Sequence, residues 1–405
     1  MKKLLAILLV CAMAFVLVAA CAADETPAAT PTPAPEATPA PEPAPPADDQ
    51  DDPPAAANGM SAEDVVVALI MHSPPPDSTL FDGSFNEGSY NGIMQFLQAH
   101  GLSESTNFMA LYSGSADTPG RIDAINDAVT AGANVLVLPG FHFRESVYEA
   151  QDLFPDVKFV VLDVEPAAGP GEPARVEANT AAILFAEQYS GFLAGYAAVR
   201  EGLRELGFVG GIAVPAVINF GHGFIQGAEF AAQELGLEPG DVTITYTYAG
   251  QFGPDPRFHT MAASWFAGGT EVIFAAAGGV GFNVFSAAEE AGGLAIGVDG
   301  DQSGASPTVI TSAMKALGPA VNDMLTAFLN DTWRGGTFLY NATNSGVALP
   351  MQTSRFENFT QAQYDAIYAQ LASGAITVSV DTSATMPSAD ANLSGLTVVT
   401  INEVS

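Results

Sequence analysis

The sequence predicts an α/β protein made of two lobes, each built on a doubly wound parallel sheet. Its 405 residues are more than a single hydrophobic core usually organises. Short apolar runs alternate with helical segments, which is typical of parallel strands covered by helices on both faces. The alternation runs from Asp64 to Leu162 and begins again near Asn179, so we expect a second lobe of the same class.

The first series ends at the acidic, Gly- and Pro-rich segment 165–177, which predicts a boundary. Before it, we expect strands at 64–72, 107–112, 135–138 and 157–162, and helices at 86–100, 122–131 and 144–153. After it, we expect strands at 182–185, 208–209, 242–248, 271–277, 294–296 and 309–310, and helices at 187–200, 219–235 and 256–266. These patterns assign residues 61–178 and about 295–335 to an N-terminal lobe, residues 179–294 and about 336–382 to a C-terminal lobe, and residues 383–405 to a peripheral tail.

The N-terminus has the features of a bacterial lipoprotein signal peptide over residues 1–21. Two lysines precede an apolar run, 4–17, that is too short to span a bilayer comfortably. The run ends in Val18-Ala19-Ala20-Cys21, where small residues before a Cys indicate acylation of Cys21. In the alternative, the signal is cleaved in the ordinary way and this Cys is incidental. The other Cys leaves with the signal, so the mature chain would hold no intramolecular disulfide.

Residues 22–60 consist mainly of Ala, Pro, Thr, Asp and Glu. Such a composition cannot bury a core, so we expect a disordered tether. Pro-rich chain extends by about 3.1 Å per residue, which would hold a folded domain well away from a bilayer. We therefore expect an extracytoplasmic protein anchored to the bacterial cell membrane through a lipid on Cys21.

The formal net charge of -33 at pH 7 limits the partners of this protein. Binding to nucleic acid requires clustered Lys and Arg, and the chain has 12 of these against 45 Asp and Glu. We therefore expect no nucleic-acid partner and no strongly anionic ligand. The turn Gly278-Gly279-Val280-Gly281 lacks the Lys-Ser/Thr of a phosphate loop, so we do not interpret it as one. We also expect no cofactor.

Four features follow predicted strands or begin predicted helices, at the edge of an α/β sheet where ligands bind. They are the loop Asp82-Gly83-Ser84-Phe85-Asn86, the aromatic residue Phe220, the glycines Gly278 and Gly279, and the pair Asp299 and Lys315. Each also has a purely structural interpretation. Phe85 and Phe220 would then be core residues, Asp299 would cap a turn, and Lys315 would be a solvated residue at a helix start.

Together these features describe a site for a flat ring that carries hydroxyl groups. Two aromatic rings from opposite lobes can stack on the two faces of a flat ring. A carboxylate can accept hydrogen bonds from two vicinal hydroxyls, and a Lys can donate to one of them. A nucleobase with its ribose fits this description and requires no net positive charge.

The loop Asp82-Gly83-Ser84-Phe85-Asn86 resembles the Asp-x-Ser-Phe-Asn motif of the basic membrane protein family. These proteins are bacterial substrate-binding lipoproteins and include purine nucleoside receptors. Further similar segments follow in the same order, over roughly residues 64 to 380: 189–195, 208–211, 274–279, 297–302 and 311–315. The resemblance implies a type I periplasmic-binding-protein fold, with two lobes joined by hinge crossings and a ligand enclosed between them.

The resemblance also implies roles for individual residues, with Asp82 and Asn86 of the first motif at the same ligand site. Phe85 and Phe220 would stack on the base, Asp299 and Lys315 would hold the ribose, and Gly278 and Gly279 would line the cleft. The first strand of the family usually ends in an Asp that binds base N–H groups, whereas this sequence has His72 there. A His does not offer two acceptor oxygens, so the identity of the base stays open. In the alternative, His72 is only a strand-end residue.

We therefore predict a receptor that binds a nucleoside, with a purine nucleoside as the first candidate, and delivers it to the permease and ATPase subunits of an ABC importer. It would act as a monomer, without catalysis and without a metal. One alternative is a receptor of the same fold for another flat-ring compound or a sugar. Another is a metal-dependent nucleoside hydrolase that uses Asp299 and Asp301. Two acids in one turn do not supply the several converging ligands that such hydrolysis needs.

Overall fold

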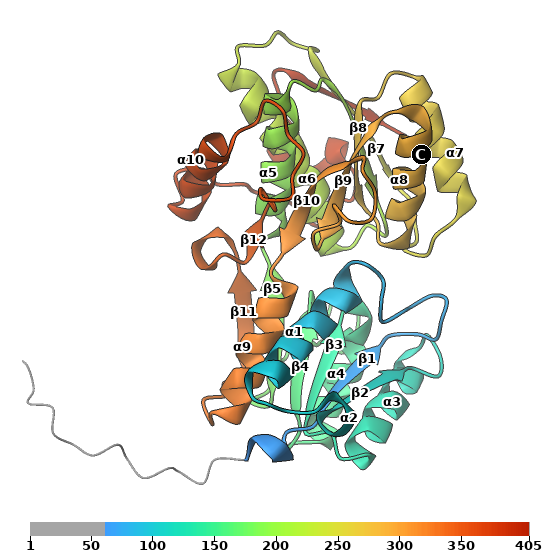
Figure 1. Ribbon diagram of the computed structural model, residues 1–405, viewed down its shortest axis with the longest axis vertical. Helices are drawn as coiled ribbons and strands as arrows, with labels where there is room; N and C mark the ends of the chain where they lie inside the picture. The colour runs from blue at the N-terminus through green and yellow to red at the C-terminus, as the bar shows by residue number, and fades with distance from the viewer. Residues whose placement is uncertain (1–60, 405) are drawn as a thin grey trace, which may run out of the picture. The chain divides into compact units, whose positions relative to one another are not determined.

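The computed structural model describes residues 61–404, in which helices cover two sheets of mainly parallel strands (Figure 1). The predicted signal peptide, the lipidation site Cys21 and the tether lie outside these residues. Between residues 61 and 404, no helix combines the length and the hydropathy that a bilayer crossing requires. The predicted α/β class with doubly wound parallel sheets is confirmed.

In the described part of the chain, the first sheet has six strands in the order β11-β5-β4-β3-β1-β2, and all neighbouring strands are parallel. The strands are β1 (Val67–Met71), β2 (Phe108–Tyr112), β3 (Val135–Pro139), β4 (Lys158–Leu162), β5 (Thr180–Phe185) and β11 (Gly336–Tyr340). β1 and β3 are buried along their whole length, which explains their unbroken apolar sequences. One face is covered by α1 (Phe85–Ala99) and α9 (Leu317–Leu329), the other by α3 (Thr118–Thr130) and α4 (Arg144–Leu153). The short α2 (Glu104–Asn107) leads into β2.

The second sheet has seven strands in the order β12-β10-β9-β8-β6-β7-β13, and only β12 is antiparallel to its neighbour among the described strands. The strands are β6 (Glu205–Gly210), β7 (Val242–Tyr248), β8 (Val272–Ala276), β9 (Leu294–Asp299), β10 (Val309–Lys315), β12 (Val347–Ala348) and β13 (Val399–Glu403). One face is covered by α5 (Glu187–Glu201) and α6 (Pro215–Glu234), with α10 (Gln361–Ala372) beside them. The other face is covered by α7 (Pro256–Ala267) and α8 (Gly279–Ala291).

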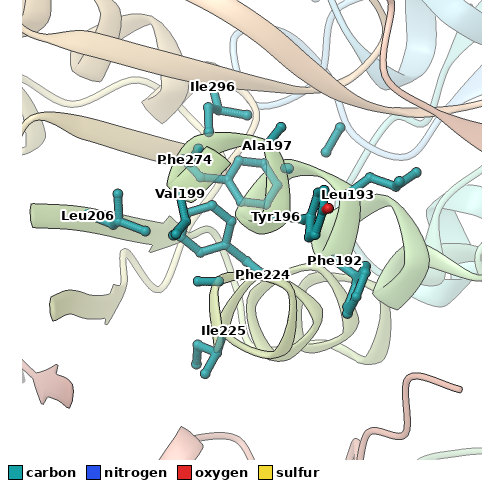
Figure 2. Packing of buried hydrophobic residues seen from close by; sticks show 14 of the residues in the cluster. Phe192, Leu193, Tyr196, Ala197, Val199, Leu206, Phe224, Ile225, Phe274 and Ile296 are labelled. Carbon is teal, nitrogen blue, oxygen red and sulfur yellow. The ribbon is translucent and has the colours of Figure 1, made fainter. Parts of the chain in front are cut away.

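The helices α5 and α6 pack with their backbones in close contact because glycines lie at their interface. A Cβ atom on Gly191 would lie 2.1 Å from the carbonyl oxygen of Phe220, and one on Gly195 would lie 2.0 Å from that of Phe224. Figure 2 shows buried side chains around this interface, among them Phe192 and Phe224. The close approach fixes the first turns of α6, and Phe220 with them.

Within residues 61–404, three segments connect the two lobes. The chain passes from β5 to α5 at Ala186, from β10 to α9 at Ala316, and from β11 to β12 through η3 (Ala342–Asn344). The amide of Ala186 donates to the carbonyl oxygen of Tyr340 at 2.9 Å, and the amide of Ala316 donates to that of Gly346 at 3.0 Å. Backbone hydrogen bonds therefore join the crossings to one another.

The lobe boundaries differ from those expected from the sequence. β9 and β10, which lie in the segment assigned to the N-terminal lobe, belong to the second sheet. β5 and β11, assigned to the C-terminal lobe, belong to the first sheet. The strands of both lobes are similarly apolar, so hydropathy shows where a strand lies in the chain but not which sheet it joins.

Residues 383–404 are also more closely integrated than the expected peripheral tail. β13 pairs in parallel with β7 and so extends the second sheet. Glu229 in α6 holds the chain where it enters β13. Its carboxylate accepts hydrogen bonds, at 2.7 to 3.3 Å, from the amides of Thr397, Val398 and Val399. Leu393, Val398 and Val399 also pack into the core of the second lobe, and the backbone hydrogen bonds that join the segment to α6 and β7 leave little trace in a hydrophobic pattern.

Candidate ligand-binding site

A cavity of about 660 Å³ lies between the two lobes, lined by residues that follow the carboxyl ends of strands in both sheets. Its volume is within the range of about 300–1,000 Å³ that is usual for small-molecule sites. The structure brings the sequence-predicted candidates together there, since the lining includes His72, Asp82, Phe85, Asn86, Phe220, Gly278, Gly279, Asp299 and Lys315.

The charged end of the cavity is built around Lys315, the last residue of β10. Its Nζ lies 2.5 Å from Oδ2 of Asp163, 3.2 Å from Oδ1 of Asp299 and 3.9 Å from Oε1 of Glu187. The Lys315 side chain is only 2% exposed. We call these four residues the Lys315 cluster. Asp163 follows β4 of the first sheet and Asp299 ends β9 of the second, so one buried cation joins carboxylates from both lobes.

The two aspartates of the cluster share an uncommon backbone conformation. Asp163 has φ 62° and Asp299 has φ 66°, both in the left-handed region. For residues other than Gly this conformation costs about 1–2 kcal/mol, and Asp is among the residues that tolerate it best. Strain of this kind is concentrated at functional sites, where the surrounding structure maintains it. Here the ion pairs with Lys315 stabilise both turns.

Burial alone would lower the pKa of Lys315, but the nearby carboxylates of Asp163, Asp299 and Glu187 outweigh burial and raise it. Burial raises the pKa of Asp163 despite the nearby lysine. Burial also raises the pKa of Glu187, and the neighbouring charge of Asp163 adds to this effect. One cation cannot neutralise three carboxylates, so a proton on Glu187 reduces the excess of negative charge.

One carboxylate oxygen of the cluster lacks a hydrogen-bond donor within the described residues. Oδ1 of Asp163 is buried and has no hydrogen-bond partner among residues 61–404, although Asp163 lines the cavity. A buried acceptor without a donor is unfavourable, which makes this atom a natural acceptor for a ligand hydroxyl.

The sequence analysis does not single out Asp163 or Glu187. Asp163 directly follows β4 and Glu187 directly follows the crossing at Ala186, much as Asp299 lies at the end of β9, and that position is the signal that points to them. The signal is not specific, because Glu165 also lies just after β4 and instead accepts a hydrogen bond from Thr337 at 2.6 Å.

Phe85 and Phe220 approach the Lys315 cluster from opposite lobes. Nζ of Lys315 lies 4.5 Å from the centre of the Phe85 ring and 5.5 Å from that of the Phe220 ring, both within cation–π range. Phe220 also packs edge-on against Phe274 in the core of the second lobe, at 5.9 Å. The sequence left two interpretations of Phe220 open, a core residue or a residue that lines the ligand site. In the structure Phe220 is both: it packs in the core and lines the cavity. Both rings can contact a ligand that lies next to Lys315.

Asp82 and Asn86 line the cavity, but their polar atoms mainly hold the loop before α1. Asp82 accepts hydrogen bonds from the amides of Ser84, Asn86 and Glu87 at 2.9 to 3.1 Å. Burial raises the pKa of Asp82 to about 6, although the hydrogen bonds from these amides lower it. Asn86 donates to the carbonyl oxygen of Thr79 at 2.8 Å. Both residues thus position Phe85.

Gly278 and Gly279 let the chain turn closely against the loop after β7. Gly278 has φ 55° and ψ -128°, which other residues rarely adopt. A Cβ atom on Gly279 would lie 2.8 Å from Cδ of Pro254. A side chain at Gly279 would therefore displace this wall of the cavity.

Hydrogen bonds also join the lobes across the cavity. Oγ of Ser84 in the first lobe donates to Oδ2 of Asp299 at 2.9 Å. Nε2 of Gln302 in the second lobe donates to the carbonyl oxygen of Gly83 at 3.1 Å. The lobes are thus in contact, with the Asp82–Asn86 loop against the turn after β9.

The pair Asp299 and Asp301 does not converge on one point of the cavity. Asp301 accepts hydrogen bonds from Thr353 at 2.6 Å and from the amide of Ser303 at 3.0 Å, and it is absent from the described lining of the cavity. Within the part of the chain that the structure describes, no group of three or more His, Cys, Asp or Glu side chains could hold a metal ion.

The two α/β lobes of the described chain, with three crossings and a cavity between them, define the type I periplasmic-binding-protein fold. Solved structures share this fold. An ABC transporter solute-binding protein from Aeropyrum pernix is 19% identical, with a TM-score of 0.65 over 79% of this chain and 95% of that chain. One from Conexibacter woesei is 22% identical, with a TM-score of 0.61 over 78% of this chain and 98% of that chain.

The chain belongs to the family of PnrA-like ABC transporter substrate-binding proteins, whose sequence profile matches residues 67–381. Basic membrane protein A1 of Borrelia garinii is 29% identical over 276 residues, which cover 67% of this chain and 76% of that protein. The ABC transporter nucleoside-binding protein BmpA of Lactococcus lactis is 28% identical over 296 residues, which cover 68% and 80%. The resemblance inferred from the motifs is thus confirmed, and the protein is a substrate-binding transport component with a small-molecule ligand and transporter partners.

Proposed function

We propose that this protein binds a nucleoside, with a purine nucleoside as the first candidate, in the cavity between its lobes and delivers it to an ABC importer. The observation that carries the proposal is the Lys315 cluster next to Phe85 and Phe220. Lys315 donates and the carboxylates accept, so together they match the hydroxyls of a ribose. The phenyl rings offer faces to a base. The nucleoside-binding Lactococcus relative supports the same ligand class.

Titration calorimetry of the purified protein with adenosine, guanosine, inosine and cytidine tests this proposal. We expect saturable heat with at least one purine nucleoside. Asp299→Asn should abolish that heat, because it removes an acceptor and weakens the hold on Lys315. Asp301→Asn is the matched control and should leave it unchanged. The absence of heat with all four nucleosides would contradict the proposal.

The alternative is a receptor of the same fold for another flat-ring compound or a sugar. What favours it is His72 in the lining of the cavity, because a His does not present the two acceptor oxygens of an Asp. Free nucleobases, ribose and other sugars belong in the same titration. Binding of one of these and of no nucleoside would select the alternative.

We also infer that a lipid on Cys21 holds the protein outside the cell membrane, as a monomer. This inference is supported by the small residues before Cys21 and the acidic segment after it. Expression of the full chain and of Cys21→Ala in a bacterial host, followed by membrane fractionation, tests it. We expect the full chain in the membrane fraction and the variant in soluble fractions. Equal distribution of the two would contradict the anchor.

A further inference from the structure

Contacts between the two lobes occur on both sides of the cavity but differ in kind. At the end away from Lys315, Phe141 of η2 (Phe141–Phe143) lies 6.5 Å from Phe252 of the second lobe, measured between ring centres. Beside the Lys315 cluster the contact is polar. There, Nε2 of Gln302 in the second lobe donates to the carbonyl oxygen of Gly83 in the first lobe at 3.1 Å. One side chain thus joins the lobes at a defined point.

The Gln302 side chain is fixed by its own lobe. Its Oε1 accepts a hydrogen bond from the amide of Val298 at 2.9 Å, and the backbone amide of Gln302 donates to Oγ of Ser312 at 3.0 Å. The residue is 3% exposed. A Cβ atom on Gly297 would lie 2.6 Å from Oε1 of Gln302, so the glycine leaves the space that this side chain occupies. Nε2 is therefore held in place to donate to Gly83.

The acceptor in the first lobe is also held in one position. Gly83 has φ 66°, a conformation that favours glycine. A Cβ atom on it would lie 2.9 Å from Cζ of Phe282 in α8. The adjacent Ser84 donates to Oδ2 of Asp299 at 2.9 Å. Because Gly83 has no side chain, the loop lies directly against the second lobe and its carbonyl oxygen reaches Gln302.

Gln302 differs from its neighbours in its relation to the cavity. Ser84 and Asp299 line the cavity, whereas Gln302 does not belong to the lining formed by residues 61–404. A hydrogen bond that exists only while the lobes are together stabilises the closed arrangement and not an open one. Such a bond slows reopening without changing any contact of the ligand.

We propose that Gln302 is a positioning residue for lobe closure: its side-chain amide binds the Gly83 carbonyl oxygen and so sets how long a bound ligand is retained. This inference rests on the proposed function for the identity of the ligand. Closure itself can be measured without a ligand. The net contribution of one hydrogen bond corresponds to about a threefold to tenfold change in rate.

The main test replaces the amide with an acid of the same shape. Gln302→Glu keeps the oxygen that accepts from Val298 and, when ionised, places an acceptor opposite the Gly83 carbonyl oxygen. In stopped-flow measurements at about pH 8, we expect nucleoside to dissociate about tenfold faster than from the wild type, with the association rate within about twofold. Gln95→Glu, on the exposed face of α1, is the matched control and should change neither rate.

Lower pH adds a measurement that a merely distorted turn would not affect. When protonated, the introduced carboxyl again has a donor for the same carbonyl oxygen. The charged groups around it are Asp299 and Asp301 of the same turn, Asp82 of the opposite loop, and Arg355, which donates to the carbonyl oxygen of Ser303. Burial and the three acids favour its protonation. The ratio of the variant's dissociation rate to that of the wild type should therefore fall by about threefold or more between about pH 8 and pH 5.

The wild type is measured at each pH because Asp82, with a pKa of about 6, also titrates in this range. Gln302→Met removes both side-chain hydrogen bonds and adds no charge, so it provides a second measurement if Gln302→Glu does not fold. It should speed dissociation by about threefold to tenfold at every pH. Thermal unfolding of each variant shows whether it is folded.

Small-angle X-ray scattering of the ligand-free proteins measures the separation of the lobes. Both Gln302 variants should have a larger radius of gyration than the wild type at about pH 8, because the closed arrangement is less populated. Gln95→Glu should match the wild type.

The outcomes separate this inference from the proposed function. If the wild type binds nucleosides but both folded Gln302 variants release them at the wild-type rate, the inference is wrong and the proposed function stands. An excess rate in Gln302→Glu that does not change with pH would also contradict the inference. If the wild type binds no nucleoside, the proposed function fails. Equal radii of gyration would then contradict the inference separately, and larger radii in the variants would support it.

Discussion

The two ends of the cavity are built from the same strand edges but are held in different ways. At one end, the Lys315 cluster is fixed by ion pairs between buried charges from both lobes. At the other, the rings of His72 and His142 stack with their centres 4.0 Å apart. Each end has one buried polar atom without a partner in the described chain: Oδ1 of Asp163 and Nδ1 of His72.

The difference between these two atoms indicates how selectivity is distributed. A carboxylate oxygen next to a lysine accepts hydrogen bonds, so the charged end requires a donor such as a hydroxyl. The aromatic end presents rings and no buried ion pair, so it suits the flat face of a ring. We therefore expect strict recognition of the sugar and tolerant recognition of the base.

Removal of the central cation should have the largest effect. Lys315→Met leaves Asp163, Asp299 and Glu187 buried without a counter-ion, which should destabilise the fold by about 3–5 kcal/mol and abolish nucleoside binding. Urea unfolding measures the loss of stability. Lys158→Met, at the half-exposed start of β4, is the matched control and should cost less than about 1 kcal/mol. Equal losses in both variants would mean that the cluster does not hold the lobes.

The two phenylalanines should separate binding from stability. Phe220→Ala removes a buried ring and should cost about 3–5 kcal/mol of stability as well as affinity. Phe85→Ala should cost about 1–3 kcal/mol of affinity through lost stacking and less stability, because Phe85 is only partly buried. Calorimetry and urea unfolding of the same samples give both values. Full affinity in Phe85→Ala would exclude the stacking role.

The charged end should also make stability depend on pH through Glu187. Its pKa is raised by burial and by Asp163, so the folded protein keeps this proton at pH values where the unfolded chain has lost it. Stability should therefore fall as pH rises above the ordinary Glu pKa of about 4.3, by up to about 1.4 kcal/mol per pH unit. Glu187→Gln should remove this contribution. The measurement is urea unfolding of both proteins between about pH 5 and pH 8, and identical slopes would contradict a raised pKa.

Salt should have the smallest effect. The Lys315 cluster is buried, and burial lowers the pKa of His72 to about 4 and that of His142 to about 3, so both rings are uncharged near pH 7. Added ions therefore screen neither end strongly. The dissociation constant for an uncharged nucleoside should change by less than about twofold between roughly 0.05 and 0.5 M NaCl. A tenfold weakening in calorimetry would mean that exposed charges, and not these two ends, contribute most of the binding.

The sequence was sufficient to place the main candidates in one cavity because each lies where a strand ends or a helix begins. It did not reveal Asp163 and Glu187, since acids after strands are common and only the lobe geometry directs these two to Lys315. It assigned β9 and β10 to the wrong sheet because a strand's hydropathy is independent of the sheet it joins. It also predicted a peripheral tail where the C-terminal segment instead extends the second sheet, with its backbone amides bound to Glu229.

One end of the cavity lies next to the three described crossings, and the other end lies far from them. Lys315 and Glu187 directly adjoin the crossings at Ala316 and Ala186, whereas Phe252 follows β7, four strands away from β10 in the second sheet. A small rotation about the crossings would barely move the charged end but would carry Phe252 well away from Phe141. We therefore expect a ligand to pass the aromatic rings last on its way out. Substitutions of the aromatic rings should mainly change the dissociation rate of the ligand, and substitutions near Lys315 should mainly change its affinity.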